Sequence, residues 1–557
     1  MKEYIRKNLP RLIVTGIHML LTFLWAGRVF MGIGINPVGT IEMKSRISTG
    51  FQTAVTYIFT ELFALVIIYC IWRLFFFLLA DFKKIYIVFL AIWILGGILV
   101  LSAWPQVFGL DDNVVTYSYA VHLVPDYWHS FYHSVIYGGC LLVFPLDFMV
   151  TLLQWSAFVF MLGFLFLRVE RVAGHAKWAV FTLLLLPNSW MIATYGHRIM
   201  IYMILALIYF TVLIFDLIEG KETSDLKDIL MGLFGAFLSV YRSEGILIGA
   251  PVYLIFLLFK KKRSIRDTTV KAVIFAVMFV AFSLPQKMGA ARYYGNDYSI
   301  YNTCERLKVI FNEPEANLDY AGAGEDILAI DRLVSVDWLK EYGLDAYRAT
   351  NNGLKGSPDI NQTRSGEEGK AYMKAYSNIC RHNLLICVKD VFNNFIHVTT
   401  GKPAYVLGQY TGVSQETPGW YYDAFDRSSE EFFGNRHTAL IVGFTEKLKT
   451  YEKFFNGLKK TFESLKKAYV YLGWLVALVL FNTISALYHL IKAIGRKDIT
   501  VLWPGLFAVF AVGLTLAVII TMPLIYTPYL ITGEYMMLFS VLTFFMKYYC
   551  GKRTKVG

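Results

Sequence analysis

Long apolar runs are the feature that most constrains the fold of this chain. An α-helix needs about 20 mostly apolar residues to cross the hydrocarbon core of a bilayer, and runs of that length recur along the whole sequence. Hydrophobic residues make up 56% of the 557 residues and charged residues only 17%, a balance outside that of soluble domains. We therefore expect an all-α polytopic membrane protein, because backbone groups in lipid must pair within helices.

The apolar runs predict about twelve transmembrane helices. Clusters of Lys and Arg beside the runs mark the cytoplasmic side under the positive-inside rule, and KKKR at 260–263 is the strongest cluster. These markers place both termini of this cell-membrane protein in the cytoplasm. The predicted spans lie near residues 12–33, 52–79, 85–104, 147–168, 178–194, 199–218, 229–242, 246–259, 269–286, 467–491, 501–522 and 528–549.

Hydropathy divides the chain into three parts. Residues 1–287 are expected to form a transmembrane bundle with an acidic outer loop at 105–135. Residues 288–466 are polar and long enough for an independent fold, so we expect a soluble, mainly helical domain on the outer face. Residues 467–557 supply the last transmembrane helices and a cytoplasmic tail.

The net charge of +12 does not indicate a nucleic-acid partner. The basic residues lie in short clusters beside the apolar runs, where a membrane protein needs them for topology. Membrane lipids are therefore the expected surroundings of these clusters.

Adjacent carboxylates follow the third predicted span. Asp111 and Asp112 either cap the next helix or supply a general base or metal ligand, with one carboxylate positioning the other. Asp126, His129 and His133 continue the same outer segment. A spacing of four residues puts both histidines on one face of a helix, where they suit packing among headgroups, a metal ion, a proton relay or phosphate binding.

Other ionisable residues lie at predicted outer helix ends. Arg242 and Glu244 separate two short apolar runs, where they either pair with each other or leave Arg242 to grip a phosphate. His197 and Arg198 either supply the same contact or extend to the lipid headgroups. Glu534 lies just inside an apolar run, where pairing with Arg242, contact with a sugar and proton transfer are all open.

The order of these features resembles the GT-C superfamily of membrane glycosyltransferases. The likeness rests on an outer acidic motif after an early span, an amphipathic segment next, and a late soluble outer domain. The segments that carry it are AWPQVFGLDDN at 103–113 and VPDYWHS at 124–130. The acid of the family usually follows the first span, whereas a complete hairpin comes before it here, which an added N-terminal hairpin would explain.

The resemblance implies an enzyme that transfers a sugar from a polyprenyl-phosphate donor to a cell-envelope glycan or lipid acceptor on the outer face. Asp111 or Asp112 would be the catalytic acid or base, His129 the histidine of the following segment, and Arg242 a contact of the lipid phosphate. The sequence requires no cofactor, and a divalent metal ion is permitted but not required. The alternatives are a polysaccharide polymerase or ligase, and a transporter or flippase of lipid-linked sugars.

Overall fold

The structure is a computed structural model, and its secondary structure is described for most of the chain. Both predicted catalytic residues, Asp111 and Asp112, and the predicted phosphate contact His197 lie outside the described residues. The described residues are 2–31, 50–80, 83–103, 116–117, 119–127, 129–145, 149–185, 198–220, 222–260, 264–293, 297–341, 366–400, 464, 473–521 and 527–553.

The regular elements of the described residues are helices, which confirms the all-α membrane class. Eight of them are long and apolar enough to cross a membrane. These are α1 (Lys2–Met31), α3 (Gly50–Ala80), α7 (Met149–Ala173), α9 (Arg198–Glu219), α12 (Ile265–Tyr293), α23 (Trp474–Arg496), α24 (Trp503–Thr521) and α25 (Thr527–Arg553). Three further helices have shorter apolar segments. They are α4 (Lys84–Ala103), whose apolar segment is Lys84–Gly97, α6 (Phe131–Val143) and α11 (Ile246–Phe259).

Two of the predicted spans differ from the helices observed. The predicted span near 178–194 starts inside a 3-10 helix, η1 (Gly174–Leu185), and continues outside the described residues. The predicted span near 229–242 corresponds to α10 (Asp225–Tyr241), which begins earlier because Ser224 caps it and acidic residues occupy its first turn. The total number of spans therefore stays a prediction.

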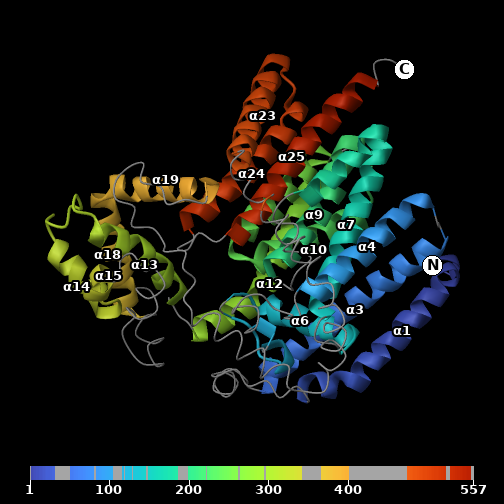
Figure 1. Ribbon diagram of the computed structural model, residues 1–557, viewed down its shortest axis with the longest axis horizontal. Helices are drawn as coiled ribbons and strands as arrows, with labels where there is room; N and C mark the ends of the chain where they lie inside the picture. The colour runs from blue at the N-terminus through green and yellow to red at the C-terminus, as the bar shows by residue number, and fades with distance from the viewer. Residues whose placement is uncertain are drawn as a thin grey trace.

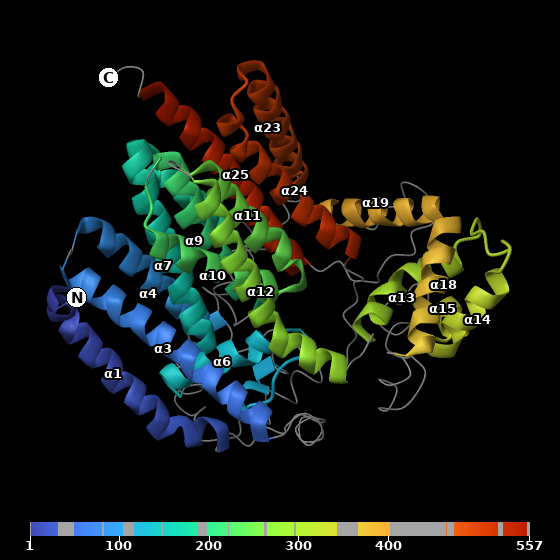
Figure 2. The same ribbon diagram turned by 180° about the vertical axis from the view of Figure 1, so that it is seen from behind.

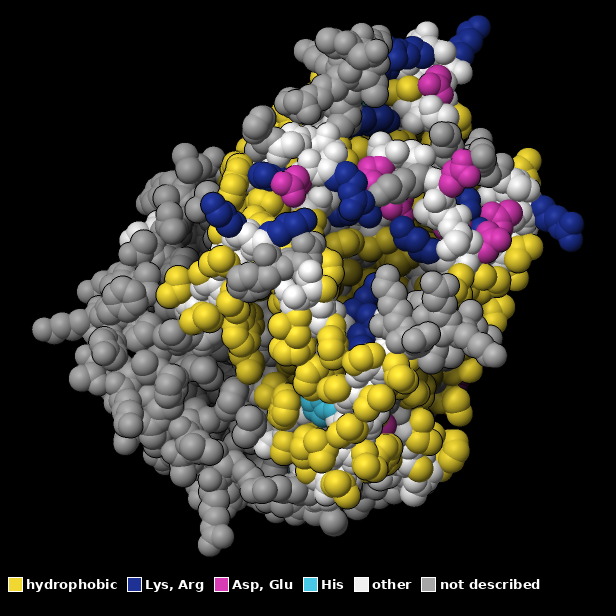
Figure 3. Space-filling model, turned by 90° about the vertical axis from the view of Figure 1, so that its right-hand side faces the viewer, with side chains coloured by type: hydrophobic (Ala, Val, Ile, Leu, Met, Phe, Trp, Pro, Cys, Tyr) yellow, Lys and Arg dark blue, Asp and Glu magenta, His cyan; other side chains and the backbone are white. Residues whose placement is uncertain are grey.

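Helices α7, α9, α10, α11, α24 and α25 pack together in the centre of the bundle, and α1, α3 and α4 lie at one side (Figure 1). On the face that Figure 3 draws, charged side chains gather in a band across the upper part, and mainly hydrophobic side chains cover the surface below it. This separation is typical of helices whose ends reach the membrane interface.

Helices α10 and α11 form a hairpin whose backbones approach closely. A Cβ atom added to Gly249 would lie 2.0 Å from the carbonyl oxygen of Gly235. The hydroxyl of Tyr209, in α9, donates a hydrogen bond of 3.0 Å to the carbonyl oxygen of Gly249. Small residues permit such contacts between membrane helices. The contact fixes the hairpin tip, which contains the 3-10 turn η2 (Ser243–Gly245).

A buried carboxylate joins helices α1 and α3. The side chain of Glu61 in α3 accepts hydrogen bonds of 2.9 Å from the hydroxyls of Thr22 in α1 and Tyr57 in α3. Glu61 is only 8% exposed. Two hydroxyl donors offset part of the cost of removing this group from water.

A second group of helices lies beside the bundle and has its own hydrophobic core (Figures 1 and 2). Its members are α13 (Asp297–Asn312), α14 (Ala323–Leu333), α15 (Val336–Glu341), α18 (Glu367–His382) and α19 (Leu384–Thr400). The guanidinium of Arg306 joins the two parts, since it donates to the carbonyl oxygens of Cys387 in α19 and Ile520 in α24. These helices fall within the predicted domain at 288–466, and their placement on the outer face stays a prediction.

We expect Gly249→Ala to destabilise the protein by about 1–3 kcal/mol, because the added methyl group would separate α10 from α11. Gly513→Ala in α24 is the matched control, since no atom lies within 4 Å of its added Cβ. Both substitutions gain helix propensity of roughly 1 kcal/mol, so the control should be neutral or stabilising. Thermal unfolding in detergent, followed by tryptophan fluorescence, measures both. Equal midpoints for the two variants would contradict the close contact.

Candidate functional site

Asp126 is the fully buried acid of the segment that precedes α6. Its Oδ2 accepts hydrogen bonds from the Thr116 hydroxyl, at 2.9 Å, and from His129 Nδ1, at 3.1 Å. Its Oδ1 accepts from the backbone N–H of His129, and its own N–H donates to the Ser134 hydroxyl. Ser130 caps α6 by accepting from the N–H of Tyr132, so the helix N-terminus holds this loop in place.

The contact between Asp126 and His129 sets the chemistry of the imidazole. When a carboxylate accepts the Nδ1–H of a histidine, it fixes the ring tautomer and raises the basicity of Nε2. Burial raises the pKa of Asp126, but the charges of His129 and Arg198 and the hydrogen bonds from His129 outweigh it and hold that pKa below its ordinary value. Asp126 is therefore ionised at neutral pH and orients His129.

Arg198, in helix α9, is a cation that acts electrostatically on Asp126. It is the first residue of α9 and only 4% exposed. A cation is disfavoured at the N-terminus of a helix, where the macrodipole is positive. The electrostatic attraction of Asp126 compensates for this position.

Arg242 and Glu244 pair with each other at the tip of the α10–α11 hairpin. Their side chains are 7% and 9% exposed. The structure thus confirms the ion-pair alternative for these two residues. The pair faces the same region as Asp126, because Tyr241 interacts electrostatically with Asp126, Arg198 and Arg242.

Two tyrosine hydroxyls complete this region. The rings of Tyr202 and Tyr241 are stacked with their centroids 5.5 Å apart, and His133 packs edge-on against Tyr241 at 4.7 Å. Both tyrosines are fully buried, and neither hydroxyl has a hydrogen-bond partner among the described residues. A buried hydroxyl without a partner costs about 1–3 kcal/mol, so these two groups are ready donors for a bound molecule.

We call this set the Asp126 cluster. Its members come from the loop before α6, from α9 and from the α10–α11 hairpin. They are Asp126, His129, His133, Arg198, Tyr202, Tyr241, Arg242 and Glu244.

The cluster gathers four of the predicted site residues, namely His129, Arg198, Arg242 and Glu244. Glu534 is buried in α25, which packs along α9. The predicted helical pairing of His129 with His133 is wrong, because α6 begins only at Phe131. The capped turn nevertheless places the ring centroids of the two histidines 6.3 Å apart.

The predicted catalytic acids are close to the cluster along the chain. Asp112 precedes Thr116 by four residues, and four residues span at most about 14 Å. Thr116 donates directly to Asp126. His197 is likewise the neighbour of Arg198 in sequence. Sequence reasoning named Asp126 without placing it in the site, and it missed Tyr202 and Tyr241, which carry no motif.

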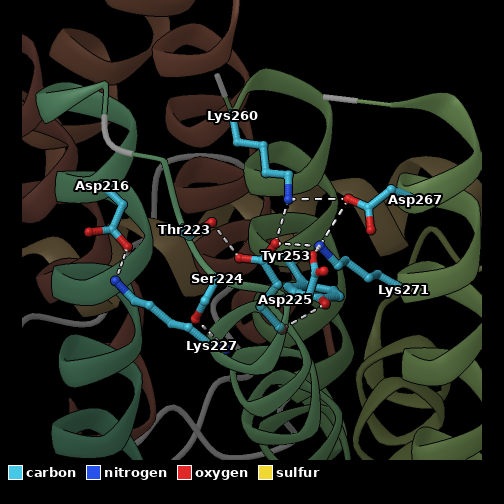
Figure 4. A network of polar contacts seen from close by, with 10 residues as sticks. Asp216, Thr223, Ser224, Asp225, Lys227, Tyr253, Lys260, Asp267 and Lys271 are labelled. Carbon is cyan, nitrogen blue, oxygen red and sulfur yellow. Dashed lines mark hydrogen bonds and ion pairs between the residues drawn. The ribbon is translucent and has the colours of Figure 1, made fainter. Parts of the chain in front are cut away.

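A second buried polar group, the Asp228 cluster, was not predicted. Lys271 is 2% exposed, and its Nζ donates to Asp225 at 2.7 Å, Asp228 at 2.7 Å and Asp267 at 2.9 Å (Figure 4). Lys260 also pairs with Asp228. Lys260 belongs to the KKKR run, which we interpreted from the sequence only as a marker of the cytoplasmic side. The ion pair of Lys260 with Asp228 was therefore not predicted.

The Asp228 cluster has the geometry of three metal ligands, since one oxygen of each of Asp225, Asp228 and Asp267 lies within 4.8 Å of the others. The ammonium of Lys271 already bonds to all three carboxylates. Two lysines thus supply the positive charge that a metal ion would bring. We interpret the cluster as an ion-pair network that joins α10 to α12.

The two clusters lie near opposite ends of helix α9. At the end away from Arg198, Arg168 of α7 pairs with Asp216 at 3.0 Å and Glu219 at 2.8 Å, and Lys227, in the first turn of α10, also pairs with Asp216. The 21 residue steps between Arg198 and Glu219 correspond to about 31 Å of helix. This length matches a hydrocarbon core of about 30 Å, and α9 carries buried charge near each of its two ends.

We expect Asp126→Asn to reduce stability most at neutral pH. The pKa of Asp126 is lower in the folded protein than in the unfolded chain, so its stabilising charge is present above the unfolded value, near 3.9, and is lost as pH falls through the folded value. Thermal unfolding between pH 7 and pH 3 should show wild type losing stability faster than the variant. Parallel curves would contradict the assignment of an ionised Asp126.

We expect Lys271→Met to destabilise the protein by about 3–5 kcal/mol, because it leaves three carboxylates without their shared cation. Lys177→Met is the matched control, since Lys177 pairs with Glu170 at an exposed site, where an ion pair contributes about 0–1 kcal/mol. Chemical denaturation in detergent compares the two. A similar small loss for both would show that Lys271 is not essential to the network.

Comparisons of the chain with protein-family models, with curated proteins and with solved structures found no match. The assignment of a function to the Asp126 cluster therefore rests on its own residues.

Proposed function

We propose that the chain is a membrane glycosyltransferase. It would move a sugar from a polyprenyl-phosphate donor to a glycan or lipid acceptor of the cell envelope, on the face of the membrane where the Asp126 cluster lies. The observation that carries the proposal is the buried Asp126–His129 pair with Arg198 and Arg242 beside it. A base and two cations thus meet at one membrane boundary of a hydrophobic bundle.

The Asp126–His129 pair suits the activation of an acceptor. Sugar transfer from a phosphate carrier needs a base that takes the proton of the acceptor hydroxyl while the anomeric bond breaks. His129 is 14% exposed and Asp126 is buried, so the histidine can reach an acceptor and the carboxylate stabilises the imidazolium that forms. Asp111 and Asp112, the predicted catalytic acids, remain candidates for this base and lie outside the described residues.

The cations suit the donor. A polyprenyl phosphate keeps its tail in lipid and its anionic head at the interface, so its enzyme needs positive charge at a helix end inside the membrane boundary. Arg198 and Arg242 provide that charge, and the Tyr202 and Tyr241 hydroxyls provide neutral donors for phosphate or sugar oxygens. Glu244 holds the Arg242 guanidinium in place.

The helical domain is attached near this site. Arg306 of α13 binds the carbonyl oxygen of Ile520 in α24, and α24 also contacts the η2 turn that carries Glu244. A polymeric acceptor would need a surface beside the catalytic end of the bundle. The domain of α13 to α19 supplies such a surface.

Transport of a lipid-linked sugar is the second candidate, and a specific observation favours it. Glu61 is a buried carboxylate 11 residues into α3, about 16 Å from the helix start. Ionisable groups at that depth frequently belong to proton or substrate pathways.

A polymerase or ligase would use the same Asp126 cluster with a growing glycan as its donor.

The direct test is transfer by purified protein in nanodiscs. The probes are polyprenyl-phosphate monosaccharides carrying a radiolabelled hexose, pentose or N-acetylhexosamine, with membrane glycan extract as acceptor. We expect His129→Gln to lower turnover by about 100- to 10,000-fold, the contribution of a general base. His489→Gln, in α23 and outside both the Asp126 cluster and the helical domain, is the matched control and should keep full activity.

The acids are tested in cells. Asp111→Asn, Asp112→Asn and the double variant should each express normally, and loss of one surface sugar with accumulation of its lipid-linked precursor would identify a catalytic acid. Unchanged surface glycans in the double variant and in His129→Gln would overturn the transferase. Movement of the labelled donor across a vesicle without transfer, abolished by Glu61→Gln, would establish the transporter instead.

A further inference from the structure

Two cations of the C-terminal helices have no carboxylate partner among the described residues. Lys492 of α23 and Lys547 of α25 form no ion pair with any residue in the part of the chain that the structure describes. Asp498 is the acid that acts on Lys547 and Arg496 electrostatically. Asp498 Oδ1 accepts hydrogen bonds from the N–H and hydroxyl of Thr500 at 2.9 and 2.6 Å, and among the described residues this acid forms no ion pair with either lysine.

Aromatic rings hold these lysines without neutralising them. The Lys492 ammonium lies 5.1 Å from the ring centre of Tyr488 and 5.7 Å from that of Tyr548, and it donates to the Tyr488 hydroxyl at 3.2 Å. The Lys547 ammonium lies 4.6 Å from the ring centre of Trp503. Cation–π contacts of this kind position a cation and leave its charge for another partner.

The lysines of the Asp228 cluster differ from these two because they have carboxylate partners. Lys260 and Lys271 are also largely buried, but each is bonded to at least one carboxylate. Lys492 and Lys547 instead act on each other, and two like charges repel. The group formed by Lys492, Arg496 and Lys547 with Tyr488, Tyr548 and Trp503, which we call the Lys492 site, therefore carries excess positive charge.

We propose that the Lys492 site binds the phosphate of an anionic phospholipid headgroup. The site lies where spanning helices α23 and α25 end and α24 begins. Aromatic rings with lysines are typical of the membrane interface, and basic pockets between spanning helices bind anionic headgroups. A lipid fits better than a soluble anion because Lys547 is half-buried and its ammonium lies over the ring of Trp503, and lysines with apolar stems beside aromatic rings suit the membrane interface.

The test counts lipid retained by the intact protein. Purified full-length protein is exchanged into nanodiscs of phosphatidylcholine with increasing phosphatidylglycerol, and bound lipid is measured by native mass spectrometry after release. Each lysine near a membrane surface contributes a factor of about five to binding of anionic lipid. We therefore expect Lys492→Gln with Lys547→Gln to weaken phosphatidylglycerol retention by about 30-fold and leave phosphatidylcholine retention unchanged.

Two further variants keep the test decisive. Lys492→Arg with Lys547→Arg retains the charges and should retain the lipid, which separates charge from packing. Lys83→Gln with Lys84→Gln removes the same charge before α4, outside the Lys492 site, and should weaken phosphatidylglycerol retention less than the site variant does, because these lysines contribute only general surface attraction. Equal loss in this control would mean a bulk charge effect. Displacement of phosphatidylglycerol by millimolar inorganic phosphate would mean a soluble anion, and either result would overturn the proposal.

Discussion

The cost of burying charge in a medium of low dielectric constant is the constraint on which this structure depends. In a membrane bundle, burying an ionised side chain is costly unless an opposite charge or hydrogen bonds compensate for its lost hydration. The Asp126 and Asp228 clusters both compensate in this way, with His129 paired to Asp126 and Lys271 between three aspartates. The length of α9 separates these groups by about the thickness of a hydrocarbon core.

The buried polar groups of the two clusters are paired to different degrees. This difference suggests that the Asp228 cluster stabilises the fold and that the Asp126 cluster binds a ligand. In the Asp228 cluster, two lysines and three carboxylates bond to one another. In the Asp126 cluster, two buried tyrosine hydroxyls stay without partners among the described residues, beside an oriented histidine and two arginines. A network whose polar groups are all engaged has little to offer a ligand, whereas unengaged donors beside fixed charges are suited to binding and proton transfer.

The same reasoning explains why the hairpin of α10 and α11 matters to the site. The close approach at Gly235 and Gly249 sets the position of the Arg242–Glu244 turn, and Tyr209 of α9 is bonded into that contact. Helix α9 supplies Arg198 at one end and Asp216 at the other. Packing in the middle of the membrane thus determines the geometry of charged groups at both boundaries.

The sequence by itself determined the class of the protein and most of its helices. Apolar runs long enough to cross lipid can only be helical, so the spans near 52–79, 147–168 and 199–218 match α3, α7 and α9 closely. The sequence also selected His129, Arg198, Arg242 and Glu244, because ionisable residues at helix ends in an apolar chain are conspicuous.

Only the tertiary structure decided which of these residues meet. Nothing in the spacing of residues 126, 198 and 242 shows that they share one site, because helix packing and not chain distance brings them together. In the sequence, Lys260 and Lys271 look like ordinary basic residues. The packing of α10, α11 and α12 brings them next to aspartates. Tyr202 and Tyr241 look like core aromatics in sequence, and only the absence of described partners for their buried hydroxyls marks them as candidate ligand contacts.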